Sequence, residues 1–256
     1  LTRALYATPK LRRLVSAAGA ALLLLLGLNT ASRAFTWSDY RLFAQIEHER
    51  NTGSARATEI MYVFAHNAGD RDAADLYLSR LQHLEPDRAW PLILEVIEHC
   101  GEPETPSELL DMALNKVRTS PFASAELAVI RRLDKAIIAG KCPGIPPDYP
   151  LEYAKVLANN PRTHVVTVRL GALVLWAASA ARKQDFDTAA LALHEAVALA
   201  ADSSPGRLNQ VIHAAARIAT QMASADEAVA FMNRISEGHS QALRRAGIKV
   251  ELHVGD

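Results

Sequence analysis

Apolar residues recur at helical spacing between residues 54 and 86, where they form two groups. Each group would share one face of a helix: Met61, Phe64 and Ala65 in the first group, and Ala74, Leu78 and Leu81 in the second. Gly69 and Asp70 interrupt the pattern between the groups, and Pro86 follows the second one. Because side chains three and four positions apart lie on the same side of a helix, this stretch predicts a hairpin of two short amphipathic helices.

A single hairpin of this size cannot bury its apolar faces, so it needs similar hairpins stacked on either side. A small residue recurs near the start of each expected second helix, at Ala74, Ala113, Ala154, Ala189 and Ala228. The spacings between these alanines are 39, 41, 35 and 39 residues. The period predicts an all-α protein with an α-solenoid of about five helical hairpins and no sheet.

The longest uncharged run lies near the amino terminus, where residues 14–31 form an 18-residue Leu-rich stretch. This length is near the lower limit for a helix that spans the hydrocarbon of a membrane. Lys10, Arg12 and Arg13 precede the run, and only Arg33 follows it closely. The excess of basic residues before the run predicts a transmembrane helix whose start is cytoplasmic and whose following residues lie outside the cytoplasm.

Two other interpretations of this run stay open. A signal peptide has the same basic flank and Leu-rich centre, and the small residues at 29–34 would form its cleavage region. The long basic lead and Pro9 within it favour an uncleaved membrane helix instead. Because the sequence begins with Leu1, the run is alternatively the last membrane helix of a larger polytopic protein.

These patterns divide the chain into parts with different expected roles. The parts are residues 1–35 as cytoplasmic lead and transmembrane helix, 36–53 as a linker helix at the membrane surface, 54–240 as the solenoid, and 241–256 as a carboxy-terminal cap or tail. We expect Thr36 and Asp39 to form a capping pair at the start of the linker helix. Three aromatic residues there would lie at the bilayer surface: Trp37, Tyr40 and Phe43.

The charge distribution bears on the class of partner. The chain has 28 basic and 28 acidic residues, and five of the basic residues but none of the acidic ones lie within residues 1–33. The remainder is therefore mildly acidic. Such a balance argues against nucleic acid as a partner.

No residue set carries a catalytic signature. The nine histidines show no metal-ligand spacing such as HExxH, and GxSxG is absent. Gly140 and Lys141 lack the spaced glycines and the Ser or Thr of a phosphate-binding loop. We expect no catalytic residue, no metal site and no small-molecule cofactor, and we interpret Trp176 and Phe231 as core residues.

The two cysteines, Cys100 and Cys142, each follow the first helix of consecutive hairpins. Outside the cytoplasm this placement favours a disulfide between them. Two unrelated buried thiols are the alternative. A metal site formed by Glu98, His99 and Cys100 is a weaker third interpretation, because adjacent residues of a helix point in different directions.

The hairpins resemble tetratricopeptide repeats, which share the positions of Gly69 at the turn, Ala74 in the second helix and Pro86 at the end. The observed spacings exceed the roughly 34 residues of that repeat, so the connecting loops would carry insertions. The first-helix Trp and Tyr of the repeat pattern are missing in the first hairpin.

The order of parts is similar to the carboxy-terminal portion of bacterial polytopic membrane proteins, the tetratricopeptide-bearing glycosyltransferases related to protein O-mannosyltransferases. In that family a last membrane helix is followed by a segment like residues 33–45, then by a Ser-x-Arg-Ala opening like residues 54–57, and then by repeats. The catalytic acidic residues of the family would lie upstream, in early extracytoplasmic loops of a membrane domain. The resemblance therefore assigns no catalytic residue to this chain.

Together, the predicted stack and the resemblance indicate a scaffold. The first helices of a solenoid line its concave face, where polar side chains can hold a protein or peptide partner. The expected interaction residues all lie on first helices: Arg56, Glu59, His66, Glu95, Glu98, His213 and Arg217.

The expected function is that of a membrane-anchored tetratricopeptide-like scaffold for protein–protein interaction, which serves envelope glycan assembly or glycosylation. It would span a bacterial inner membrane once, through residues 14–31, with the helical array in the periplasm. The alternative is the non-catalytic carboxy-terminal part of a membrane glycosyltransferase whose catalytic domain lies upstream.

Overall fold

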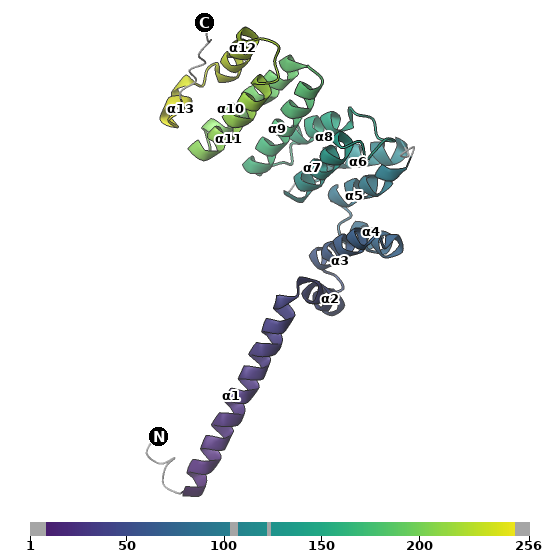
Figure 1. The fold of residues 1–256 in the computed structure, drawn as a ribbon, viewed down its shortest axis with the longest axis vertical. Coiled ribbons are helices and arrows are strands. Elements are labelled where there is room, and N and C mark those ends of the chain that lie inside the picture. The colour runs from purple at the N-terminus through teal and green to yellow at the C-terminus, as the bar shows by residue number, and fades with distance from the viewer. Residues whose placement is uncertain (1–8, 103–106, 122–123, 249–256) are drawn as a thin grey trace. The chain divides into compact units, whose positions relative to one another are not determined.

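A computed structural model describes residues 9–102, 107–121 and 124–248, with side chains from residue 13 onward. Within these ranges every regular element is helical, so the all-α prediction is confirmed (Figure 1). The end of the expected carboxy-terminal tail, residues 249–256, lies outside the described residues. The chain forms two compact units, residues 1–84 and residues 85–256.

The first unit contains a long helix followed by three shorter ones. Their bounds are α1 Pro9–Ser38, α2 Tyr40–Arg50, α3 Ala55–Ala68 and α4 Arg71–Leu84. Helix α2 packs against α1 and α3, and α3 packs against α4. Two ring pairs accompany these contacts, Trp37 with Phe43 at 5.6 Å and Tyr40 with Phe64 at 6.0 Å between ring centroids.

Helix α1 is long and apolar enough, from Arg13 to Ser38, to cross a membrane, and none of it is buried within the protein. Thr36 does not cap the next helix as expected. The helix continues through it, and the Thr36 hydroxyl donates to the Ser32 carbonyl at 3.0 Å. Asp39 is the residue that caps α2, because its carboxylate accepts hydrogen bonds from the backbone N–H groups of Arg41 and Leu42 at 2.9 and 3.1 Å.

Helices α3 and α4 form the hairpin that the sequence pattern predicts. Gly69 ends α3 with φ of 74°, a left-handed conformation in which glycine avoids the strain of a side chain. The predicted face of α4 is buried, but on α3 the fully buried aromatic residue is Tyr62, and Met61 and Phe64 are only half-buried. Because α2 packs on α3 beside α4, the buried stripe lies partly on a second side of the helix.

The second unit contains four helix pairs and a short last helix. Their bounds are α5 Trp90–Glu98, η2 His99–Gly101, α6 Ser107–Thr119, α7 Ser124–Ile138, α8 Tyr149–Ala158, α9 Val166–Arg182, α10 Phe186–Ala201, α11 Pro205–Ala219, α12 Ala225–Ser236 and α13 Ser240–Arg245. Along the first helices, α5 contacts α7, α7 contacts α9, and α9 contacts α11. The first helices therefore form one continuous layer (Figure 1). Along the second helices, α6 contacts α8 and α10 contacts α12, whereas α8 packs mainly on α9 of the next pair.

The recurring alanines lie where second helices pack. Ala74 is 1% exposed, and Ala113, Ala154 and Ala189 are fully buried. Their small side chains allow neighbouring helices to approach closely. Ala228 is only half-buried, because it belongs to the last pair, which is followed by a helix of six residues.

Polar side chains join one pair to the next. The Asn160 amide after α8 donates to the backbone carbonyls of Val117 and Ser120 at the end of α6, at 2.6 and 2.9 Å. The Tyr149 hydroxyl donates to the Leu110 carbonyl of α6. Burial raises the pKa of Tyr149 well above its usual value, so this hydroxyl keeps its proton.

Candidate functional site

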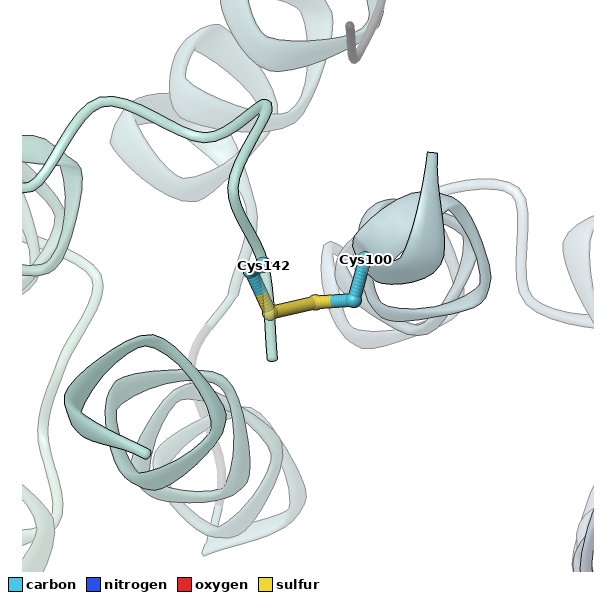
Figure 2. Close-up of a disulfide and its surroundings, with 2 residues drawn as sticks. All are labelled: Cys100 and Cys142. Atoms are coloured by element: carbon cyan, nitrogen blue, oxygen red, sulfur yellow. A yellow bond between two sulfur atoms is a disulfide. The ribbon is translucent and has the colours of Figure 1, made fainter. Parts of the chain in front are cut away.

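A disulfide joins the first two helix pairs of the second unit. Cys100 lies in η2 directly after α5, and Cys142 lies in the connector after α7; their sulfurs are bonded (Figure 2). Both residues are buried. A bonded sulfur offers no thiolate to a metal, and the nearby His99 Nδ1 lies 2.7 Å from a carboxylate oxygen of Glu102.

A groove of about 340 Å³ crosses the layer of first helices. Its walls come from three helices: Leu127 and Arg131 of α7, Thr167, Leu170, Gly171 and Val174 of α9, and Arg207, Gln210, Val211, Ala214 and Arg217 of α11. The α9 and α11 residues recur at intervals of three and four positions, which places them on one face of each helix. We call this feature the arginine groove.

The floor of the arginine groove is apolar and closely packed. Leu127, Leu170, Val211 and Ala214 are all buried. Gly171 makes the packing of α7 on α9 possible, because a Cβ there would lie 2.3 Å from Leu127 Cδ2 and 3.1 Å from Arg131 Nη2. The glycine therefore determines where Leu127 and Arg131 lie.

The rim of the groove is positively charged. Arg131 and Arg217 are exposed, Arg207 is half-buried, and the residues that line the groove include no Asp or Glu. Within the part of the chain that the structure describes, none of these three guanidinium groups makes a hydrogen bond or an ion pair. Three cations without a protein counter-ion favour an anionic ligand, and guanidinium binds carboxylates with two parallel hydrogen bonds.

The sequence-predicted interaction residues lie on three helices, α3, α5 and α11. Arg217 lines the groove, and His213 is exposed on the same helix but does not line it. Glu95 and Glu98 are half-buried on α5, which packs on α6 and α7, whereas α11 packs on α9, α10 and α12. The other three residues lie on α3 of the first unit: Arg56, Glu59 and His66.

Sequence reasoning missed Arg131 and Arg207. The signal for Arg207 was present, since Arg207, Gln210 and Arg217 recur at helical spacing on a first helix. Arg131 is followed by Arg132, which does not line the groove, and the sequence does not distinguish these two arginines.

The aromatic residues interpreted as core are buried, with Trp176 at 7% and Phe231 at 3% exposure. Comparisons with known proteins add no assignment: no family model, no curated protein and no solved structure matches this chain. The resemblance to tetratricopeptide-bearing glycosyltransferases therefore stays a prediction from the motifs.

Proposed function

We propose that this chain is a membrane-anchored scaffold whose arginine groove binds an acidic, extended segment of a partner protein. The observation that carries the proposal is the set of unpaired arginines on two of the three first helices that form the groove, with Arg131 on α7 and Arg207 and Arg217 on α11. The layered contacts of α5 to α12 support an α-solenoid of tetratricopeptide-like hairpins. In such a solenoid the first helices form the face that takes up peptides.

The groove suits a peptide rather than a compact anion. Its volume of about 340 Å³ falls within the range for ligand sites, and its charges are spread out rather than gathered at one point. Arg207 and Arg217 lie ten positions apart on α11, about 15 Å along the helix axis, and Arg131 lies on α7. Apolar floor residues between the arginines would contact the uncharged side chains of the peptide. Acidic side chains at intervals along the partner would then pair with Arg131, Arg207 and Arg217.

The anchor and the compartment complete the proposal. Helix α1 would remain in a bacterial inner membrane as a single span, with the basic residues before it in the cytoplasm. The array would then lie in the periplasm. The disulfide supports this compartment, because such bonds persist in oxidising surroundings and are rare in the cytosol.

The test is peptide binding by the full chain in detergent micelles, followed by fluorescence anisotropy. The probe is a labelled peptide of alternating Glu and Ser, compared with the same peptide carrying Gln for Glu. We expect the Glu peptide to bind more tightly, and each of Arg131→Gln, Arg207→Gln and Arg217→Gln to weaken it about tenfold, the value of one charge-assisted hydrogen bond.

Arg132→Gln is the matched control, because this arginine neighbours Arg131 on α7 but does not line the groove. It should leave the affinity unchanged. Equal binding of the Glu and Gln peptides, or an equal loss in the control and groove variants, would overturn the proposal.

A further inference from the structure

A second hollow, of about 450 Å³, lies in the first unit between the end of α1 and helix α2. Its polar lining includes Asn29, Ser32 and Arg33 from α1 and Glu47 and Arg50 from α2. Trp37, Phe43 and Ile46 form its apolar wall. None of the functions considered so far uses this hollow.

The position of the hollow along α1 corresponds to the headgroup level of a membrane. The uncharged run ends at Ala31. At about 1.5 Å per residue, Arg33 lies about 3 Å and Trp37 about 9 Å beyond that point along the helix axis. Phe35 and Trp37 are strongly exposed at this level, as aromatic residues are where a chain leaves the hydrocarbon.

The charges of the hollow are incompletely balanced. Arg33 and Arg50 line it with Glu47 as the acidic residue, so its formal charge is positive by one. Among the described residues neither guanidinium has a hydrogen bond or ion pair. The Asn29 amide and the Ser32 hydroxyl add neutral donors beside them.

We propose that this hollow binds the phosphodiester headgroup of an anionic phospholipid in the leaflet where the chain leaves the membrane. Arg33 and Arg50 donate to the phosphate oxygens, and the single negative charge of the headgroup balances the hollow. Trp37 and Ile46 form the apolar wall beside the headgroup. The inference rests on the proposed membrane anchor.

The experiment uses the full chain released from detergent micelles and measures bound lipid by native mass spectrometry. The probes are phosphatidylglycerol, phosphatidylcholine and soluble glycerol phosphate. We expect phosphatidylglycerol to be retained in preference to phosphatidylcholine. Arg33→Gln and Arg50→Gln should each weaken it about fivefold, whereas Glu47→Gln should strengthen it.

Arg41→Gln is the matched control, since Arg41 is an exposed arginine of α2 outside the hollow. It should leave lipid retention unchanged. Equal retention in wild type and both hollow variants, equal retention of the two lipids, or displacement by glycerol phosphate at the same concentration would each overturn the lipid site.

An alkaline wash of membranes that contain the wild-type chain separates this inference from the anchor. If the chain stays in the membrane but the Arg33 and Arg50 variants retain as much lipid as the wild type, the lipid-site proposal is contradicted and the membrane anchor is not. If the wash releases the chain from the membrane, both the membrane anchor and the lipid site are contradicted.

Discussion

Two groups of arginines in the second unit differ in what they contact. Between the helix pairs, Arg88 forms two hydrogen bonds to Glu126, at 2.6 and 2.7 Å, and Arg182 pairs with Asp134. In the arginine groove, Arg131 and Arg217 face solvent with no acidic residue in the lining. The first group holds helix pairs together, whereas the second has no protein counter-ion among the described residues.

Burial explains the difference. Glu126 is fully buried, so its charge must be compensated inside the protein, and its hydrogen bonds raise the pKa of Arg88 above the usual value. Burial also raises the pKa of Asp134, which Arg182 opposes. Arginines at a solvent-exposed rim carry no such requirement. Their unpaired state costs the fold little and preserves their charge for a partner.

The largest effect should come from Arg88→Gln. Because this change removes the guanidinium that is hydrogen-bonded to the buried Glu126, we expect the free energy of unfolding to fall by about 3–5 kcal/mol. Arg131→Gln should change it by less than about 0.5 kcal/mol. Urea unfolding of both variants measures the contrast. A similar loss of unfolding free energy in both variants would contradict the difference between the two groups of arginines.

Removal of the disulfide should lower the free energy of unfolding by nearly as much as Arg88→Gln. Cys100 and Cys142 are 42 positions apart, and closing such a loop contributes about 4 kcal/mol in the chain-entropy model. The double Cys→Ser variant should therefore unfold at lower urea than the wild type. Its peptide affinity should be retained while it is folded, because neither cysteine lines the arginine groove. A stability unchanged by the substitution would contradict the expected contribution of the bond.

Gly171→Ala should have an intermediate effect, and it links packing to the groove. The added methyl group meets Leu127, and overpacking costs about 1–3 kcal/mol, against about 1 kcal/mol gained in helix propensity. We expect a small loss of stability and weaker peptide binding as Arg131 shifts. Gly206→Ala is the control, since nothing lies within 4 Å of a Cβ there. Equal peptide affinity in the two variants would show that Gly171 does not position the rim.

The smallest effect concerns His48 in the first unit. Burial, together with the charge of Arg80, lowers the pKa of His48 below 6.5, although Glu49 opposes this shift. A base with a lowered pKa binds its proton less well in the folded state, so stability should fall as pH drops below 6.5. Urea unfolding at about pH 7.5 and about pH 5.5 should show this loss in the wild type and less of it in His48→Gln. The same pH dependence in both proteins would assign it to other groups.

Much of the helical fold could be predicted because its signals are local. The hairpin of α3 and α4 follows from the spacing of its apolar residues and from Gly69, and the recurring alanines indicate the second helices. The expected start of the linker helix at Thr36 lies three residues before the observed cap at Asp39. The reason is that α1 continues through residues 36–38, where no residue breaks a helix. Tyr62 was missed because the contact of α2 with α3 is not visible in either helix alone.

The candidate site was less accessible from sequence. The sequence alone does not show which polar residues of the first helices form contacts within the protein, because these contacts depend on how the helices pack. Glu95 and Glu98 were expected on an open surface, but both are half-buried and engaged in contacts. Arg131 and Arg132 differ only in the direction they face, and this direction follows from how α7 packs on α9 at Gly171.

The most direct test of the account is one thermal melt series on the variant in which Arg131, Arg207 and Arg217 are all changed to Gln. Without peptide, its melting temperature should match that of the wild type. An excess of the Glu peptide at about 100 times its Kd should raise the wild-type melting temperature by about 5–10 °C and leave the variant unchanged. A variant that melts much earlier without peptide, or one that the peptide stabilises as it does the wild type, would contradict a groove whose arginines are kept for a partner.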